Sequence, residues 1–347
     1  MNWSDRQYAI GRGLAAIRHK GGIEYQHYLR ALIKHKLDEL LSSSTGSTFP
    51  NISKDQLSNI KIEVPPLPEQ RAIARILGSL DDKIELNRHM NATLEAMAQA
   101  IFKSWFVDFD PVRAKMEGEE PAGLDAETAT LFPDDFEVVD GQEVPKGWKF
   151  ASLPDAIEVN PRISLRKGDS APYLDMKNMP TQGHRAIEWL ERPFGSGVKF
   201  VNGDTLIARI TPCLENGKTA FVDFLKGAQV GWGSTEYIVF RPKSPLPKEY
   251  GYYLARSESL RDYAIQNMTG TSGRQRVVTS CFDNYPIVVP SSEVAQRFEE
   301  IVKPIMALIK QRDEESHTLA ATRDTLLPKL ISGEIRVPDA MLEAAEA

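Results

Sequence analysis

The sequence predicts an α+β protein in which mixed α/β domains are separated by two long helices packed as an antiparallel coiled coil. Three observations lead to this prediction. Residues 62–106 and 287–331 are two copies of one segment set 225 positions apart. Each copy holds apolar residues spaced alternately four and three apart, which is typical of a coiled-coil seam. The stretch between the copies alternates short apolar runs with glycine-rich loops, which is typical of strands.

The two seams share one order of apolar and polar positions. Both are apolar at their ends and polar in the middle. An antiparallel pair places Asn87 and Asn91 opposite Arg312 and Ser316, so a slip of one heptad would bury an unpaired polar group. These four residues are therefore predicted to fix the register. The seam positions are Ile73, Leu77, Leu80, Ile84, Asn87, Asn91, Leu94, Ala98, Ile101 and Trp105, repeated as Phe298, Val302, Ile305, Ile309, Arg312, Ser316, Leu319, Arg323, Leu326 and Leu330.

Recognisable signals mark the ends of both long helices. Pro68 suits a first helical turn, because that turn needs no amide donor. Ser291 or Ser292 is the expected N-cap of the second helix, and Gly333 follows its end. At 1.5 Å per residue, each seam spans roughly 50 Å, far longer than an average globular helix.

The other predicted elements are shorter. Residues 25–41 and 250–266 are each expected to form one amphipathic helix. The segment from Asp108 to Pro145 is acidic and rich in glycine and proline, which predicts a linker with weak local structure. A new domain opens at Lys146. The predicted strands are 8–10, 60–64, 205–210, 236–240 and 287–289.

The overall charge hides an uneven distribution. The chain carries 42 Lys and Arg against 48 Asp and Glu, a net charge of −6. Residues 146–290 hold 19 basic and 14 acidic residues, or +5, which leaves 23 against 34, or −11, for the remainder. A basic module in an acidic chain is expected where one surface meets phosphate and others meet protein, although ordinary charge heterogeneity explains it equally well.

Cysteine content and hydropathy indicate the compartment. Cys213 and Cys281 are the only cysteines, and the sequence shows no signal-peptide core. It also has no run of about eighteen apolar residues that would suggest a membrane span. A reducing, cytoplasmic setting is therefore expected, with both cysteines as thiols and no membrane contact.

One glycine-rich loop carries side chains suited to reading DNA. The loop is GTSGRQR at 270–276. Arg can donate two hydrogen bonds to guanine, Gln can pair with adenine, and Thr or Ser can hold phosphate. A solvated turn is the plainer interpretation of such a loop by itself. The corresponding segment STGST at 44–48 has no arginine, so any DNA contact there is weaker or differently built. The candidate DNA-binding residues in the first loop are Thr271, Ser272, Arg274, Gln275 and Arg276.

A second candidate surface combines residues 208–218 with 231–235. Its DNA-binding candidates are Arg209, Thr211, Lys218 and Ser234, which have side chains that can meet phosphates or base edges. Trp232 lies beside them. A lone aromatic residue between glycines is more often part of a core.

Enzyme signatures are absent from the sequence. An amino-methyltransferase needs an Asn-Pro-Pro-aromatic motif, and the nearest string is NPR at 160–162. The sequence has no GxxxxGK[ST] phosphate loop, and its six histidines show no ligand spacing. Asp134, Glu143 and Lys146 suggest a metal nuclease only faintly, because a linker offers no scaffold to hold the carboxylates. We therefore expect no catalytic residues and no metal site.

The order domain, long helix, domain, long helix is also the plan of the specificity subunit of type I restriction-modification systems, and the chain resembles that family over nearly its whole length. The matching stretches are VPPLPEQRAIA at 64–74, LDDKIELN at 80–87, FKSWFVDF at 102–109, PKGW at 145–148 and LISGEI at 330–335. The resemblance implies two target-recognition domains, each reading one half of a split DNA sequence. It also implies conserved helices that hold the domains apart and dock methyltransferase subunits.

The chain departs from this plan at its beginning. The 225-residue offset reaches back so that Tyr28 falls on Tyr253, and residues 1–65 match only the last part of 146–290. The first recognition domain is therefore expected to be truncated at its N-terminus. The predicted organisation is the C-terminal part of a first recognition domain at 1–65, a long helix at 66–108, an acidic linker at 109–145, a complete second recognition domain at 146–290, a long helix at 291–333 and a tail at 334–347.

The predicted function is a non-catalytic, sequence-specific subunit that positions other subunits on a split target in double-stranded DNA. The resemblance implies binding to type I methyltransferase subunits and, through them, to the translocating endonuclease. S-adenosylmethionine, Mg and ATP are expected on those partners and no cofactor on this chain. Two alternatives stay open: a half-length subunit that works as a homodimer, and a methyltransferase-binding remnant that no longer reads DNA.

Three phenylalanines at the end of the first long helix allow two interpretations. Phe102, Phe106 and Phe109 lie beyond the seam. They form either a further protein-binding surface or an apolar cap inside the helix pair.

Overall fold

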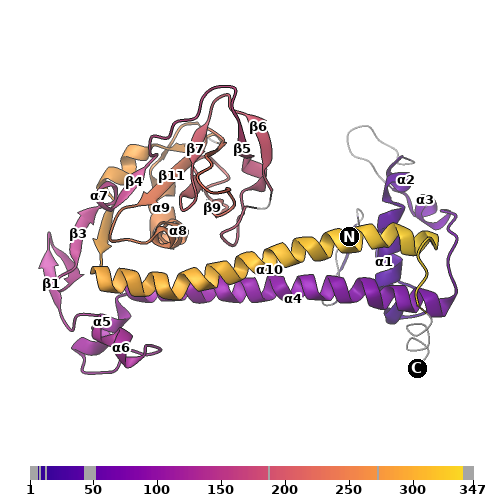
Figure 1. Cartoon of the computed structure of the whole chain (residues 1–347), viewed down its shortest axis with the longest axis horizontal. Coiled ribbons are helices and arrows are strands. Elements are labelled where there is room, and N and C mark those ends of the chain that lie inside the picture. The colour runs from indigo at the N-terminus through magenta and orange to yellow at the C-terminus, as the bar shows by residue number, and fades with distance from the viewer. Residues whose placement is uncertain are drawn as a thin grey trace. The chain divides into compact units, whose positions relative to one another are not determined.

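The computed structural model describes residues 7, 9–11, 14–42, 52–186, 188–271 and 273–338. The chain divides into a terminal unit, Met1–His89 with Arg312–Ala347, and a central unit, Met90–Gln311. Two long helices, α4 (Leu67–Phe106) and α10 (Ser292–Ser332), contribute to both units and lie side by side (Figure 1). Among the described residues, no helix combines the length and the apolar character needed to cross a membrane.

The long helices run antiparallel in each unit. In both units, positions that rise along α4 meet positions that fall along α10, which confirms the predicted coiled-coil orientation. The contacting pairs are Asp81 with Arg323 and Asn87 with Ser316 in the terminal unit, and Asn91 with Ile309 and Phe102 with Phe298 in the central unit. Ser291 accepts a hydrogen bond from the Val294 amide at the start of α10, and Gly333, at φ 73°, follows its end.

The terminal unit adds short helices to one end of the pair. They are η1 (Ile23–Tyr25), α1 (Gln26–His35), α2 (Leu37–Ser42) and α3 (Lys54–Ser58). The helix predicted over 25–41 is therefore broken, and the break lies at Lys36, where ψ is 6°. Tyr28 of α1 is buried in one cluster with Ile73, Leu77 and Leu330 of the long helices.

The strand predicted at 60–64 does not form. These residues have no regular structure, although Ile62 packs against the terminal-unit cluster. The repeated segment β14 (Pro286–Val289) is a strand because β3 (Lys149–Ser152) pairs with it. Residues 60–64 have no such partner strand among the described residues, and an isolated strand leaves its backbone groups unpaired. For the strand predicted at 8–10, Ala9 and Ile10 are not in a strand and Tyr8 lies outside the described residues.

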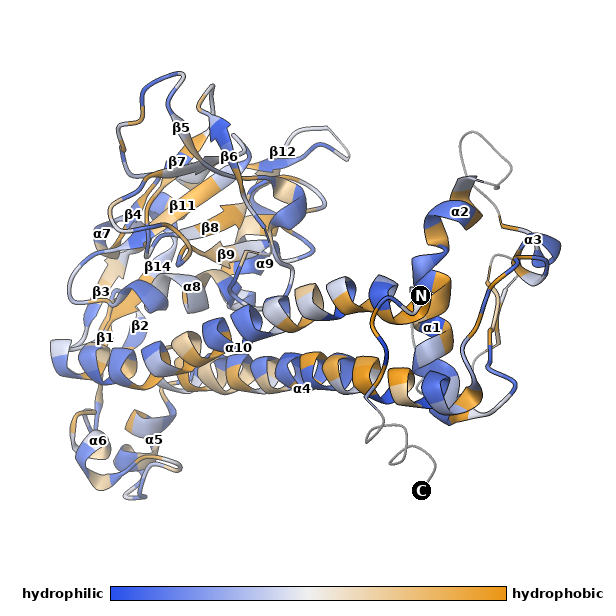
Figure 2. Ribbon diagram, turned by 45° about the vertical axis from the view of Figure 1, so that its right-hand side comes forward, coloured by the Kyte–Doolittle hydropathy of each residue, from blue (hydrophilic) through white to orange (hydrophobic). Residues whose placement is uncertain are grey.

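Two four-stranded sheets form the middle of the central unit. The first has the order β4-β11-β8-β9 and the second β6-β5-β10-β7, in which β10 runs parallel to β5 and the other pairs are antiparallel. Figure 2 shows hydrophobic residues concentrated in β8 and β11. The strands are β4 (Ile157–Val159), β5 (Ser170–Leu174), β6 (Leu190–Pro193), β7 (Val198–Phe200), β8 (Thr205–Ala208), β9 (Thr219–Phe221), β10 (Gly231–Gly233) and β11 (Tyr237–Pro242).

Helices and short pairs of strands complete the central unit. The helix predicted over 250–266 is in fact two, because Ser257 leaves helical geometry and caps the second helix by accepting the Leu260 amide. β12 (Met268–Thr269) pairs with β13 (Arg276–Val277). The remaining helices are α7 (Leu153–Ala156), η2 (Met176–Asn178), α8 (Lys248–Arg256), α9 (Glu258–Gln266) and η3 (Thr279–Asn284).

The segment 109–145 is folded, so the prediction of weak local structure is wrong. It contains α5 (Asp110–Met116), α6 (Ala126–Thr130), β1 (Phe136–Val139) and β2 (Gln142–Pro145). Three of its apolar residues, Val112, Phe132 and Val144, are buried in the large central-unit cluster, and others, among them Leu131 and Phe136, pack against it partly buried. Acidic and proline-rich composition therefore describes the surface of this segment, while its buried and partly buried apolar side chains anchor it.

The phenylalanines at the end of α4 belong to the core. Phe102 and Phe106 are 3% and 6% exposed, and both rings pack against Tyr250 and Phe298. Phe109 packs partly buried against the same cluster. The interpretation as a further protein-binding surface is therefore wrong for Phe102 and Phe106, because Tyr250 of α8 packs over them.

Candidate nucleic-acid interface

Three loops of the central unit meet at Glu236. The Arg209 amide at the end of β8 donates to the Glu236 carbonyl at 2.9 Å, and Ser234 Oγ accepts the Glu236 amide at 3.1 Å. Arg276 Nε donates to both carboxylate oxygens, at 2.9 and 3.0 Å. The two surfaces predicted from sequence therefore form one site, with Glu236 as its common partner.

Backbone hydrogen bonds hold the 270–276 loop against the end of β8. The Thr211 amide donates to the Gln275 carbonyl at 3.0 Å, and the Val277 amide donates to the Arg209 carbonyl at 2.9 Å. Ile210 forms an isolated bridge with Arg276. The loop is consequently placed by main-chain contacts, which do not depend on its exposed side chains.

The Arg276 guanidinium is oriented before any ligand arrives. Its side chain is 43% exposed although Nε is bound to Glu236, and one Nη reaches the Arg274 carbonyl at 3.3 Å. A fork fixed in this way loses little side-chain freedom on binding a base edge or a phosphate. Arg276 is the best-oriented exposed cation among the predicted residues.

The tip of the loop is exposed. Thr271 and Arg274 are exposed, and the Arg274 amide donates to the Thr271 carbonyl at 2.9 Å to close a turn. Gln275 is half-buried, with its carbonyl occupied by Thr211. Ser272 lies outside the described residues. The tip therefore presents Arg274 to solvent, as a contact with DNA requires.

Other predicted residues are already engaged within the protein. Lys218 is half-buried, and its ammonium donates to the Met176 carbonyl. The Thr211 hydroxyl lies 3.4 Å from the Gln275 carbonyl. Arg209 is half-buried, and its Nε is buried without a hydrogen-bond partner among the described residues. Lys218 thus has a structural contact, whereas Arg209 keeps unsatisfied donor capacity.

Sequence reasoning missed Glu236. It precedes a strand and lies 40 positions from Arg276, so no local pattern connects the two residues. Beneath it, the buried Tyr237 hydroxyl donates to the Leu174 carbonyl at 3.2 Å, and burial raises the pKa of Tyr237 above its usual range. That tyrosine is a neutral structural support.

A buried polar cluster joins α8 and His184 to α4. Glu95 of α4 accepts the Tyr252 hydroxyl at 2.6 Å, and its other oxygen lies 3.4 Å from His184 Nδ1. Burial alone would raise the pKa of Glu95, but the hydrogen bonds from His184 and Tyr252 and the charge of Arg256 hold that pKa below its ordinary value. The ionised carboxylate is therefore the form that fits this site.

Arg256 connects the same cluster to the candidate interface. It donates to the Tyr252 hydroxyl at 3.1 Å and to the carbonyls of Thr181, Gly217 and Thr219 at 2.7, 2.8 and 3.1 Å. Gly217 and Thr219 flank the base of the loop that follows β8. The Arg256 guanidinium thus holds this loop against α8, the helix to which Arg256 belongs.

The polar middle of the helix pair agrees with the predicted register at Asn87 and differs from it at Asn91. Asn87 is fully buried, and its amide nitrogen reaches Ser316 Oγ at 3.2 Å, the Arg312 carbonyl at 3.4 Å and Glu315 at 2.8 Å. Asn91 instead donates to the Ile309 carbonyl at 3.3 Å. Both asparagines therefore face α10, with Asn87 opposite the predicted pair.

Comparisons with known proteins agree on one family. Residues 1–96 match the model of the type I restriction modification DNA specificity domain. The specificity subunit of the type I restriction enzyme HindI from Haemophilus influenzae is 29% identical over 86% of this chain and 74% of its own length. That of MjaIX from Methanocaldococcus jannaschii is 26% identical over 94% and 73%. A solved S subunit from M. genitalium has a TM-score of 0.49 at 16% identity, covering 88% of this chain and 72% of its own.

Proposed function

Because the chain belongs to the family of type I restriction-modification specificity subunits, we propose that its central unit reads DNA through the three loops that meet at Glu236. One observation carries this proposal: a main-chain framework holds Arg276 half-exposed and pre-oriented next to the exposed Arg274. The excess of basic residues in 146–290 supports it, since phosphate contacts supply much of DNA affinity.

The two arginines have different roles in this proposal. Arg276, fixed by Glu236, meets a base edge in the major groove, where a guanidinium can pair with guanine O6 and N7. Arg274, at the exposed tip, meets phosphate. Thr271 and Gln275 line the same loop, while Arg209 and Ser234 support it from the neighbouring loops.

The chain acts as a positioning subunit and carries out neither methylation nor cleavage. Type I methyltransferase subunits bind it and supply S-adenosylmethionine, and the restriction subunit, with its Mg and ATP, is held through them. The names of the similar proteins, specificity subunits of type I restriction enzymes, support this division of labour. Neither a homodimer nor a remnant that has lost DNA reading is favoured by similarity that spans most of the chain.

Titration of DNA at several salt concentrations tests the reading loops. Arg276→Ala should cost about 1–3 kcal/mol on the preferred sequence and relax preference at one position. Arg274→Ala should weaken binding to all sequences alike and reduce the slope of log affinity against log salt by about 1.

Two further variants serve as controls. Glu236→Gln keeps Arg276 but removes the charge that orients it, so a smaller loss of specificity is expected. Lys149→Ala removes an exposed charge on β3, away from the loops, and should leave both quantities unchanged. Unchanged binding in both arginine variants would move the interface away from these loops.

A methylation assay tests the positioning role. The purified chain with labelled S-adenosylmethionine and DNA carrying many sites should transfer no methyl group. Transfer should begin when the methyltransferase subunits of its own system are added. Any transfer by the chain alone contradicts the proposal.

A further inference from the structure

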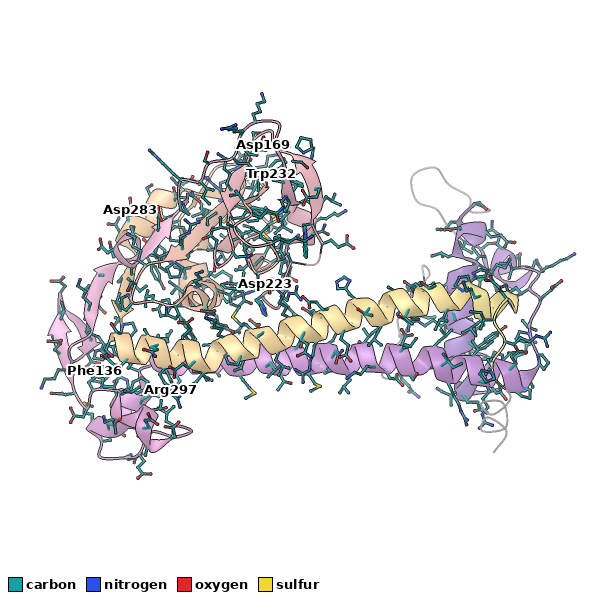
Figure 3. The ribbon with its side chains drawn as sticks, in the orientation of Figure 1. Phe136, Asp169, Asp223, Trp232, Asp283 and Arg297 are labelled. Atoms are coloured by element: carbon teal, nitrogen blue, oxygen red, sulfur yellow. The ribbon has the colours of Figure 1, made fainter. Side chains whose placement is uncertain are left out.

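A second feature lies beside the reading loops, at the sheet β6-β5-β10-β7. It is a notch of about 390 Å³. Figure 3 shows Trp232, one of its lining residues, in the part of the central unit that carries this sheet. Two of the lining residues, Ser234 and Thr235, directly precede Glu236 in the chain. The lining side chains used below are Tyr173, Arg192, Ser196, Trp232, Ser234 and Thr235.

Arg192 is held over two aromatic rings. Its guanidinium carbon lies 5.0 Å from the centre of the Tyr173 ring and 5.9 Å from that of Trp232. The residue is exposed, and none of the carboxylates in the described part of the chain forms an ion pair with it. An arginine oriented by rings instead of by an acid keeps its full charge for a ligand.

The floor beneath Arg192 is rigid. Trp232 is 5% exposed, and its Nε1 donates to the Arg192 carbonyl at 3.3 Å. The strands approach so closely that a Cβ on Gly233 would lie 2.7 Å from the Leu174 carbonyl, and one on Gly197 would lie 2.0 Å from the Gly233 carbonyl. Only glycine fits both positions, which fixes the geometry of the notch.

The lining of the notch suits an anion. None of its nine lining residues is acidic, and it combines one guanidinium with the hydroxyls of Ser196, Ser234 and Thr235. Arg276 forms an ion pair with Glu236, the residue that follows Thr235 in the chain. The two arginines therefore differ in chemistry. The Arg276 guanidinium is oriented by Glu236, which also balances its charge. The Arg192 guanidinium has no such acidic partner among the described residues and lies among hydroxyl donors.

We propose, resting on the proposed function, that the Arg192 notch binds a backbone phosphate of the DNA that the loops read. The guanidinium and the three hydroxyls donate to the phosphate oxygens. Such a contact carries no sequence information but sets the register of the duplex against Arg276. No sequence motif marks Arg192, because the notch is built from three segments that together span some sixty positions of chain, at residues 173, 192 and 232.

The test measures DNA binding by the full chain, in complex with its methyltransferase subunits, across a range of salt. Arg192→Ala and Arg192→Gln should weaken binding to preferred and unrelated duplexes by the same factor. They should reduce the salt slope by about 0.9, so a fourfold rise in salt costs about 3.5-fold less affinity than in the unaltered chain. Arg192→Lys should keep the slope, and Lys149→Ala is the matched control.

Every other outcome is decisive. An unchanged slope in Arg192→Gln, with thermal unfolding like that of the unaltered chain, overturns the notch and leaves the proposed function intact. Relaxed preference at one base pair makes Arg192 a base contact and overturns the phosphate assignment. Loss of methyltransferase binding with an unchanged slope makes the notch a protein contact. Absence of DNA binding by the unaltered complex overturns the proposed function itself.

Discussion

The two units use one repeated frame with different chemistry. Tyr28 shares a buried cluster with Ile73 and Leu77 in the terminal unit, and the positions 225 residues later, Tyr253, Phe298 and Val302, share one in the central unit. The terminal cluster is small and mostly aliphatic. The central cluster is aromatic, with the ring centres of Tyr253 and Phe298 6.1 Å apart.

The units also differ in the α4 carboxylate that binds the neighbouring elements. In the terminal unit, Asp81 pairs with Arg30 of α1 and Arg323 of α10, and its side chain is 18% exposed. In the central unit, Glu95 is 6% exposed and receives the Tyr252 hydroxyl. The repeat therefore specifies where a domain docks on the helices, and the side chains decide how firmly. In the unit that carries the candidate interface, the carboxylate that makes this attachment is the less exposed of the two.

The largest expected effect concerns the aromatic cluster. Phe298→Ala should destabilise the central unit by about 3–5 kcal/mol, because a fully buried ring leaves a cavity. Hydrogen exchange followed by mass spectrometry should show faster exchange in the central unit alone. Ile73→Ala, at the equivalent position, should accelerate exchange in the terminal unit alone. Equal acceleration in both units by either variant would show that they unfold as one body.

The next effect concerns Glu95. Glu95→Gln should cost about 1–3 kcal/mol near neutral pH, because a buried partner loses its acceptor. The pKa of Glu95 is lowered in the folded state, so its contribution is present above the ordinary value of 4.5 and is lost as pH falls through the lowered pKa. Urea unfolding at neutral and acid pH should show the gap between variant and parent shrinking in acid.

Glu249 is the matched control for this experiment. Burial raises its pKa, so its contribution is present at low pH and lost as pH rises. Glu249→Gln should therefore lose no stability at neutral pH. A Glu95 gap that does not change with pH would contradict the assigned ionised state.

The smallest effect concerns Asp81. Asp81→Asn should cost about 1 kcal/mol or less, because its ion pairs are partly exposed to solvent. Added salt should weaken the parent toward the variant. Thermal unfolding at low and high salt measures this difference, and a loss as large as that of Glu95→Gln would remove the contrast between the two attachments.

The periodicity of apolar residues predicted the long-range architecture, because the whole pattern lies within each long helix. The seam positions of α4 and α10 determined the antiparallel orientation and placed Asn87 opposite Ser316. Breaks within predicted helices were missed where a single residue causes them, as at Ser257, which separates α8 from α9. Composition misled at 109–145, since the buried Val112, Phe132 and Val144 and partly buried neighbours such as Phe136 pack this acidic segment against the central-unit cluster.

The candidate site was only partly predictable for a similar reason. The loop 270–276 could be recognised from glycines and arginines within one short stretch. Its joining with Arg209 and Ser234 depends on Glu236, and that contact spans 40 positions of chain. Lys218 looked equivalent to the arginines in sequence, yet folding directs its ammonium to the Met176 carbonyl.

The central claim is that the loops at Glu236 read DNA sequence, and selection from a random duplex library tests it most directly. The unaltered chain, with its methyltransferase subunits, should enrich one defined sequence. Arg276→Ala should lose preference at one or two adjacent base pairs and keep it at every other selected position. An unchanged sequence preference in Arg276→Ala, or equal loss at all positions, would contradict the claim.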